Sequence, residues 1–507
     1  MSIRPTFLAF QTASRAIAAS QANIDVTGNN IANANTEGYT RQRVDQTSLS
    51  NSGYTQKYTM PGVSVGLGVE ITNIRQYRDP FLDARYREHT AENGKLNSIL
   101  SGLEDLENIF DEAATAGLKN ELSMFVKELQ TLSQTPSAPD IALIARTSAQ
   151  KITQMLNTYS NQVSQVRAQQ VFDLNKVIIQ NDFNTKVKNI AALNDQIRKE
   201  QTYGNSPNEL YDQRNLLLDQ LSSMANIKIS SLPEKISEDL TIERLTVSLY
   251  DTATGTSIGL IDSGLYNTLY LKDDGVEARI GIATSFAPPK DSDITDFLSG
   301  GSIRGYLDLI NGKGSEEFKG IPHYQSSLDV FASNFARILN DINSIDPLNP
   351  KPLLGAPAGE SIRASNIKIS DQWMKDPAYI TTSLVGADDG NNILRMISAM
   401  NSEASFYKDA TDPSPQIMFK GSFHDYLSGV IGELALDVEL HRNYAETSDN
   451  VLSNLFAAKE SLSGVSLNEE GINLMAYQKS YNAAMRYFNV LDEAVDAIIN
   501  KMGLAGR

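Results

Sequence analysis

Four histidines are the side chains that could most readily carry out acid–base or metal chemistry near neutral pH. They are His89, His323, His424 and His441, and they lie far apart in the sequence. None belongs to an H-E-x-x-H or similar arrangement, which would place two metal ligands on one face of a helix. Each is therefore better interpreted as a surface or helix-capping histidine than as a ligand.

Other arrangements that carry out catalysis are missing from the sequence as well. It contains no G-x-S-x-G, no G-x-x-x-x-G-K-[ST] and no carboxylate cluster with the spacing of metal ligands. It has no cysteine, which removes disulfides, thiolate metal sites and thiol nucleophiles together. The Gly-Leu-Gly at 66–68 falls short of a dinucleotide fingerprint and is better explained as turn glycine. We predict that the protein is not an enzyme and binds no cofactor or metal.

Two adjacent carboxylates, Glu469 and Glu470, could act as a pair or could supply charge to a helix. Ser466 precedes them and forms an S-x-x-E capping box with Glu469, the signature of a helix N-terminus. Acidic residues in a first turn also stabilise the partial positive charge at that end of a helix. We interpret the pair as first-turn charge and expect the last helix to begin near Leu467.

Apolar residues recur every seven positions near both ends of the sequence, which is typical of helices that pack along one seam. Small residues accompany the N-terminal stripe, whereas the C-terminal stripe is bulky, so the two are natural partners. A pair of ordinary core helices is the alternative. The N-terminal stripe consists of Phe10, Ile17, Ile24 and Ile31, with Ala13, Ser20, Thr27 and Ala34 as its small positions. The C-terminal stripe consists of Leu467, Leu474, Tyr481, Phe488, Val495 and Met502, with Tyr477, Ala484, Leu491 and Ile498 in the second heptad position.

Asparagine is unusually dense in the N-terminal stripe. Each asparagine costs a helix about 0.6 kcal/mol relative to alanine, so five cost about 3 kcal/mol. Their side chains both donate and accept, so we expect them to satisfy polar groups of packed neighbours without burying charge. Gly38 suits a left-handed helix cap, and Tyr39 should start an extended segment. The five asparagines are Asn23, Asn29, Asn30, Asn33 and Asn35.

The secondary structure predicted for the middle of the chain changes several times between strand and helix. Residues 39–77 alternate like β-strands, and glycines in 62–77 suggest a hairpin bend. Residues 80–225 are strongly helical, with a long proline-free stretch from 141 to 203 that favours an elongated bundle. The fold class predicted is α+β, mainly α: coiled-coil helices at both ends, an elongated helical rod domain, and inserted β-rich outer modules. The predicted divisions are 1–60 with 448–507 (terminal helical assembly domain), 61–230 with 300–345 and 425–447 (elongated helical domain), 231–299 (β-rich outer module) and 346–424 (mixed irregular outer insert).

The charge balance narrows the possible partners. The chain has 507 residues, with 44 Lys and Arg against 61 Asp and Glu, which gives a net charge of −17. This argues against a duplex nucleic-acid binder, which needs a basic face to neutralise phosphates. No run of eighteen apolar residues is present, so no membrane span is expected. The first residues do not have the pattern of a secretory signal peptide.

Several stretches resemble a known family. NNIANANTEGYTRQ, beginning at residue 29, resembles the N-terminal signature of bacterial flagellar axial proteins, which include rod, hook and hook-associated proteins. SGVSLNEEGINLMAYQKSYNAA, beginning at residue 463, is similar to their C-terminal signature. PGVSVGLGVEITNIRQYRDPFLDARYRE, DQRNLLLDQLS and GGSIRGYLDLIN resemble blocks of the hook-associated protein 1 family in particular. The resemblance covers about half of the chain and leaves 231–299 and 346–424 unmatched.

The resemblance implies a structural protein of the junction between the flagellar hook and filament. Such a protein is exported unfolded by the flagellar type III apparatus and assembles outside the cell as a homo-oligomeric ring. Its partners would be further copies of itself, the hook protein and hook-associated protein 3. An export chaperone would hold the C-terminal helix. Its paired terminal helices would line an inner tube, with the β-rich modules facing outward.

Two other functions remain open from the sequence. The nearer is another axial protein, such as the hook protein, and the more distant is a secreted adhesin or enzyme that uses the outer modules. Under the preferred interpretation, an assembly interface forms along both terminal stripes. Its expected members are Phe10, Ile17, Ile24, Asn29, Asn30, Ile31, Asn33, Asn35, Gly38, Tyr39, Leu467, Leu474, Tyr477, Tyr481, Ala484, Phe488, Leu491, Val495, Ile498 and Met502.

Overall fold

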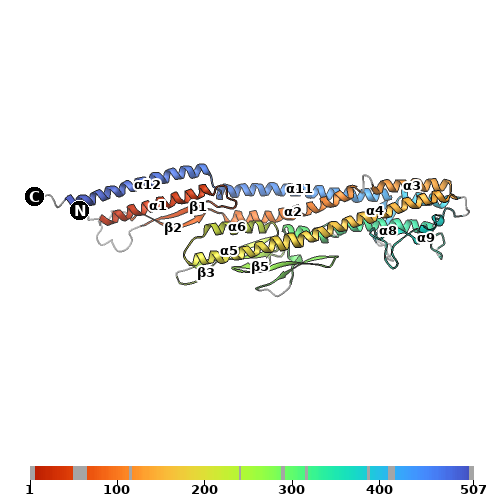
Figure 1. The fold of residues 1–507 in the computed structure, drawn as a ribbon, viewed down its shortest axis with the longest axis horizontal. Helices are drawn as coiled ribbons and strands as arrows, with labels where there is room; N and C mark the ends of the chain where they lie inside the picture. The colour runs from red at the N-terminus through yellow and green to blue at the C-terminus, as the bar shows by residue number, and fades with distance from the viewer. Residues whose placement is uncertain are drawn as a thin grey trace.

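The chain folds into a long, mainly helical rod in which the first and last helices lie together at one tip (Figure 1). The mainly α, α+β class expected from the sequence is confirmed, because helices build the rod and the strands form small separate sheets. The computed structural model describes residues 6–49, 66–112, 117–238, 241–286, 292–314, 318–346, 348–384, 389–408 and 417–501.

The tip of the rod is built from both ends of the chain, and we call it the terminal unit. Its two long helices lie side by side, and a two-stranded antiparallel sheet packs against the first of them. The strands pair Gln42 with Gln76 and Ser48 with Val69, so Gly66 and Gly68 lie in the connection between the strands, as the glycines of 62–77 predict. The terminal unit consists of α1 (Thr6–Ala32), β1 (Gln42–Ser48), β2 (Val69–Gln76), α12 (Leu467–Asp496) and the short η5 (Ala497–Lys501).

The body of the rod begins with two long antiparallel helices, α2 (Pro80–Glu112) and α11 (Phe423–Ser463). Buried apolar residues of α2 recur at helical spacing and fix the face that it turns inward. The proline-free stretch forms one long helical run, as its composition predicts. The remaining helices of this part are α3 (Leu118–Gln134), α4 (Pro139–Phe172), η2 (Asp173–Phe183), α5 (Asn184–Thr202), α6 (Asn208–Ser222) and α7 (Gly301–Asn311).

A β-rich module lies along one side of the body, below α5 in Figure 1. It contains a four-stranded sheet in the order β3-β4-β5-β6 and a three-stranded sheet in the order β7-β8-β9. Its apolar side chains share one core with η2, α5, α6 and α7. Its elements are β3 (Ile227–Lys235), β4 (Thr241–Tyr250), β5 (Ser257–Asp262), β6 (Leu265–Tyr266), β7 (Thr268–Asp273), β8 (Ala278–Ala283), β9 (Ser292–Asp293) and η3 (Thr295–Phe297).

The far end of the rod has a second core, rich in aromatic rings. Phe406 stacks on Tyr426 with centroids 4.6 Å apart, and Phe331 packs edge-on against Phe423 at 5.4 Å. The expected insert at 346–424 contributes Trp373 to this core, together with α3, α4 and α8, so its described part is integrated into the body. The remaining elements at this end of the rod are α8 (Ile321–Asn343), β10 (Leu354–Gly355), β11 (Lys368–Ile369), α9 (Asp371–Lys375), η4 (Pro377–Tyr379), α10 (Asn391–Asn401), β12 (Ala404–Tyr407) and β13 (Ile417–Gly421).

One glycine at the start of α7 is required by its surroundings. Gly301 has φ of +82°, and a Cβ atom there would collide with the backbone of Met224. Gly301→Ala should therefore lower the free energy of unfolding by at least about 2 kcal/mol, measured by denaturation followed with circular dichroism. Gly432→Ala, in an exposed turn of α11 with no atom within 4 Å, should instead stabilise by about 0.5–1 kcal/mol. Equal effects of the two substitutions would contradict this account.

Candidate functional site: the paired terminal helices

The two terminal helices are partners and run antiparallel. At one end, Phe10 packs edge-on against Phe488, with ring centroids 5.1 Å apart and planes at 80°. At the other end, Asn30 Nδ2 donates to Glu470 Oε2 at 3.2 Å. The two helices therefore meet along their length, as their complementary stripes predict.

The predicted interface residues are only partly buried within one chain. The structure places most of them along the α1–α12 seam, and their role as an assembly interface stays a prediction. Asn30 is buried, whereas Asn35, Gly38 and Leu467 are exposed. The half-buried ones are Phe10, Ile17, Ile24, Asn29, Ile31, Asn33, Tyr39, Leu474, Tyr477, Tyr481, Ala484, Phe488, Leu491 and Val495. The side chain of Ile498 and the whole of Met502 lie outside the described residues.

The most buried line on α1 consists of small and polar residues, not of the large heptad residues. This helix packs against α12 on one side and against the β1–β2 hairpin on the other. Its deepest positions therefore lie between these neighbours, where bulky side chains would not fit. They are Ala13, Ala19, Ser20, Asn23, Val26, Thr27 and Asn30.

Asn30 uses every hydrogen-bonding position of its side chain. Its Nδ2 donates to Gln42 O at 3.0 Å as well as to Glu470, and its Oδ1 accepts from Gln42 N at 3.0 Å and from Tyr39 Oη at 2.9 Å. The side chain is 1% exposed. A buried amide with all four bonds made is stabilising and permits only one alignment of its partners. Asn30 thus connects α1, β1 and α12.

Glu470 is the charged partner at this point. It is 1% exposed, and Arg41 Nη2 lies 2.7 Å from its Oε1, while Nη1 of the same arginine contacts the exposed Glu469 at 3.0 Å. A carboxylate this deeply buried is strongly destabilising unless a cation and a hydrogen-bond donor satisfy it. We call Asn30, Arg41 and Glu470 the polar hub. It joins residues 440 positions apart in the chain.

Ser466 caps α12 by accepting from Glu469 N, and Glu469 and Glu470 lie in the first turn of α12, as predicted. The sequence did not indicate that Glu470 is also buried. Only Asn30 satisfies neighbouring elements as expected. Asn23 Nδ2 donates to Ala19 O of its own helix at 2.7 Å. The other three asparagines do not join α1 to α12 in the described hydrogen bonds.

The end of α1 also differs from the expectation. The helix stops at Ala32, so Asn33 and Asn35 lie in the following turns. Asn33 Nδ2 bonds Asn29 O at 3.1 Å, which is the local competition with helix hydrogen bonds that asparagine favours. Gly38 has φ of +77°, which confirms the predicted left-handed position.

A polar joint holds the terminal unit to the body. Gln76 Nε2 donates to Asp212 Oδ1 at 2.7 Å, and Asn208 Nδ2 donates to Gln42 Oε1 at 3.1 Å. Asp212 is 6% exposed. Burial and the nearby negative charge of Glu209 raise the pKa of Asp212 from 3.8 to about 6. The hydrogen bonds from Thr40 act in the opposite direction and lower it. Neither the capping pattern nor the heptad spacing in the sequence indicates that Asp212 is buried at this joint.

A second set of buried charges fixes the joint from the side of α2. Arg87 Nε lies 2.6 Å from Asp219 Oδ1, and Lys459 of α11 reaches the other oxygen of the same carboxylate. Arg78 Nε pairs with Asp83 at 3.0 Å. Burial disfavours ionisation of Asp83, but the hydrogen bond and charge of Arg78 keep its pKa below the usual value. These pairs connect α2, α6 and α11 where the terminal unit begins.

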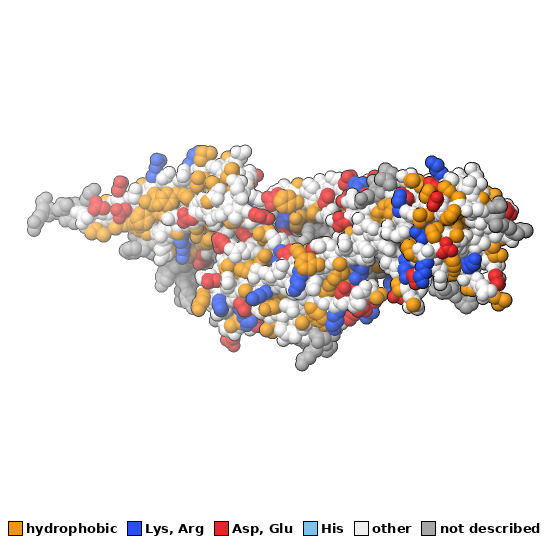
Figure 2. All heavy atoms as spheres, turned by 45° about the vertical axis from the view of Figure 1, so that its right-hand side comes forward, with side chains coloured by type: hydrophobic (Ala, Val, Ile, Leu, Met, Phe, Trp, Pro, Cys, Tyr) orange, Lys and Arg blue, Asp and Glu red, His pale blue; other side chains and the backbone are white. Residues whose placement is uncertain are grey.

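The side of α12 that faces away from α1 exposes apolar side chains among charged ones, since Lys479, Arg486 and Glu493 follow Ile472 at intervals of seven residues. Ile472 is 64% exposed and Val490 is 61% exposed, and both lie opposite the seam with Phe488. Leu467, Met475 and Tyr487 are exposed as well. Figure 2 shows a band of hydrophobic side chains along the terminal unit, at the left. An exposed apolar surface of this extent is typical of a protein–protein contact.

The described residues offer little basis for the other chemistries considered. Within these ranges, no three His, Asp or Glu side chains are grouped to hold a metal ion. His323 lies near Glu433, with Nε2 at 3.6 Å from Oε2, and His441 Nδ1 contacts Asp437 O at 2.8 Å. None of the described helices is both long and apolar enough to cross a membrane.

Comparison with known proteins shows which proteins this chain is similar to. The family described as flagellar hook-associated protein FlgK helical domain matches residues 103–346, and the flagella basal body rod protein family matches residues 10–40. Flagellar hook-associated protein 1 of Bacillus subtilis (strain 168) is 29% identical over 99% of both chains. The chain is therefore similar to flagellar hook-associated protein 1 over its full length. This full-length similarity sets aside the alternative of a different axial protein.

Two further proteins of this kind are similar at lower sequence identity. The Escherichia coli (strain K12) protein is 22% identical over 95% of this chain and 97% of its own length. The solved structure of the flagellar hook junction protein FlgK from Burkholderia pseudomallei shares the fold, with a TM-score of 0.57. It is 14% identical and covers 76% of this chain and all of that chain. The family is one of flagellar structural proteins.

Removing the central side chain of the polar hub should loosen both terminal helices. Asn30→Ala leaves Glu470, Tyr39 and the Gln42 backbone short of partners, so the free energy of local opening should fall by about 2–4 kcal/mol. Amide hydrogen exchange in α1 and α12 measures this. Asn35→Ala, at an exposed position of the same chain, should leave exchange unchanged. Equal protection in both variants would rule out the hub as the main connection.

The buried carboxyl group at the joint should make stability depend on pH. The pKa of Asp212 in the folded chain lies above its ordinary value. Its contribution to the free energy of unfolding is therefore complete below pH 3.8 and is lost as pH rises through about 6. The wild-type chain should therefore lose up to about 3 kcal/mol of unfolding free energy across this interval, relative to Asp212→Asn. Denaturation at a series of pH values measures how steeply the free energy of unfolding changes with pH in each variant. Glu88→Gln, at an exposed residue, should keep the wild-type slope, and parallel curves for Asp212→Asn would refute the assignment.

Proposed function

We propose that the protein is the structural subunit of the junction between the flagellar hook and filament, assembled as a homo-oligomeric ring through its paired terminal helices. The observation that supports this most directly is that apolar side chains of the paired terminal helices remain incompletely covered within one chain. Phe488 and Leu491 are only half-buried in the seam, and Ile472 and Val490 are exposed on the other side of α12. Apolar surface left on an already paired helix favours further packing between copies in an assembly.

The partners follow from the family and from the position of this surface. The FlgK structure similar to this chain is described as a flagellar hook junction protein. By analogy, the chain would contact the hook protein on one side and hook-associated protein 3 on the other. The helical body would form the next shell and the β-rich module would face outward. This placement would be extracellular, at the distal end of the hook.

Export by the flagellar type III apparatus is part of the same proposal. The chain has no cysteine, so no disulfide has to form or break during passage in an unfolded state. The apolar surface of α12 would be a hazard before assembly, since exposed apolar stripes promote aggregation. An export chaperone that covers α12 would remove this hazard until secretion.

A charge placed in the seam tests the role of the terminal pair. Leu491 is half-buried in α12, and Leu491→Asp would place an uncompensated carboxylate there. Cells with this change should release filament protein into the medium and carry at least ten-fold fewer attached filaments. Electron microscopy and analysis of the medium measure both quantities.

The matched control introduces the same charge on the exposed surface of a helix outside the terminal unit. Asn454→Asp lies in α11 at an exposed position, and cells carrying it should assemble filaments as the wild type does. Export of the variant chains is checked in the same medium. Normal attached filaments with an exported Leu491→Asp chain would overturn the proposed role of the terminal pair.

A further inference from the structure

Two short connections link the terminal unit covalently to the body of the rod. Residues 77–79 lead from β2 into α2, and residues 464–466 lead from α11 into α12. Neither connection contains helix or strand, and Gly464 lies in the second of them. Hinges in proteins are a few loop or element-terminal residues that absorb changes in backbone angles. The covalent arrangement therefore allows the terminal unit to turn as one piece.

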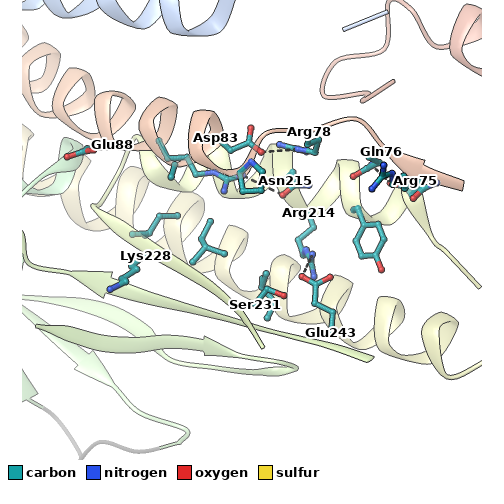
Figure 3. Close-up of a pocket in the computed structure, with 18 of the residues that line it drawn as sticks. Arg75, Gln76, Arg78, Asp83, Glu88, Arg214, Asn215, Lys228, Ser231 and Glu243 are labelled. Carbon is teal, nitrogen blue, oxygen red and sulfur yellow. Dashed lines mark hydrogen bonds and ion pairs between the residues drawn. The ribbon is translucent and has the colours of Figure 1, made fainter. Parts of the chain in front are cut away.

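The contacts across this boundary are mainly polar. Among the described residues, neither of the two hydrophobic cores of the body includes a residue of the terminal unit. Clefts of about 830 Å³ and 490 Å³ flank the polar joint, and Arg78 and Asn215 line both. Figure 3 shows Gln76 and Arg78 along one wall of the larger cleft. Relative motion of two units is expected unless a large apolar interface holds them, so this boundary favours motion.

The polar joint leaves two buried atoms without hydrogen-bond partners in the part of the chain that the structure describes. Asp212 Oδ1 accepts from Gln76, but Asp212 Oδ2 has no donor. Gln42 Oε1 accepts from Asn208, but Gln42 Nε2 has no acceptor. Buried polar atoms without partners destabilise the closed arrangement, and opening the joint would let water bond to both. The closed joint is therefore only weakly favoured.

The protonation state of Asp212 decides how unfavourable this closed arrangement is. An ionised carboxylate keeps a charged oxygen buried without a donor, whereas a protonated carboxyl group is neutral. The groups that face it are Glu209 of α6, which opposes ionisation, Arg78, which favours it, and the neutral phenol of Tyr39. Arg78 Nε is already paired with Asp83 at 3.0 Å. Burial is the largest influence and raises the pKa of Asp212 to about 6.

We propose that the polar joint is a pH-sensitive latch. It holds the terminal unit against the body while Asp212 is protonated, and it lets the terminal unit rotate about residues 77–79 and 464–466 once Asp212 is ionised. Water reaches the carboxyl group in the open arrangement, so its pKa returns there to the ordinary value. The ratio of open to closed chains should therefore rise by up to about a hundred-fold between about pH 4 and pH 7. The latch is a property of the single chain and goes beyond the proposed function.

The absence of cysteine allows two labels to be introduced without background. Asn482→Cys on α12 and Gln196→Cys on α5 are exposed positions on opposite sides of the polar joint. Spin labels on this pair report their separation by electron–electron double resonance, measured on the full-length chain at pH 5 and pH 7.5. We expect one narrow distance distribution at pH 5 and a distribution at least about two-fold wider at pH 7.5.

Three matched variants assign the change to the latch. Gln196→Cys with Asn454→Cys on α11 gives a pair within the body, whose distance distribution should be the same at both pH values. Asp212→Asn cannot ionise, so the pair across the joint should keep its narrow distribution at pH 7.5. Glu209→Gln removes a neighbouring, exposed carboxylate of the same helix and should retain the widening at pH 7.5.

Three results would overturn the latch. They are an equally narrow distribution at both pH values in the labelled parent chain, widening that persists in a folded Asp212→Asn chain, and an equal change in the body pair. Because replacing a buried residue can disturb folding, Gln76→Ala is a second variant, which removes the donor to Asp212 Oδ1 and leaves the carboxyl group in place. It should widen the distribution already at pH 5, and a narrow distribution there would contradict the role of the polar joint. All of these outcomes leave the proposed function intact, because no measurement involves assembly.

Discussion

The hydrogen bond between Asn30 and Glu470 is the contact on which the terminal unit depends. Two antiparallel helices with half-buried apolar seams could slide past one another at little cost, because apolar contacts are not directional. The buried amide and carboxylate, with Arg41, are satisfied in only one alignment. That alignment also fixes β1 through Gln42, and β1 fixes β2. The polar joint at Asp212 then connects this arrangement to the body.

The sequence predicted the parts of the terminal unit that follow from local rules. Heptad spacing identified both helices, the S-x-x-E pattern placed the start of α12 at Leu467, and Gly38 has the expected left-handed conformation. It did not identify Glu470 as buried, because a carboxylate in a first turn has the same local pattern whether or not another helix covers it. Burial of a charge depends on Arg41 and Asn30, which local spacing cannot bring together.

The body shows the same division between local and non-local information. The long helical run from α4 to α5 and the strand content of 231–299 follow from proline placement and alternation. The residues at 346–424 looked irregular because their elements are short, yet Trp373 is fully buried in a core shared with α3, α4 and α8. Short elements gain their stability from the surfaces that they cover, and the sequence of the segment alone does not describe those surfaces.

The polar hub joins positions 440 residues apart, and this separation has a consequence for the order of events. A chain that stops before residue 467 can fold its body but has no partner for α1, so the surface that combines both helices cannot exist. The hub can therefore form only in a molecule that contains both α1 and α12. Fragments released by interrupted synthesis or proteolysis would be excluded from any structure that recognises that pair, without a separate quality-control factor.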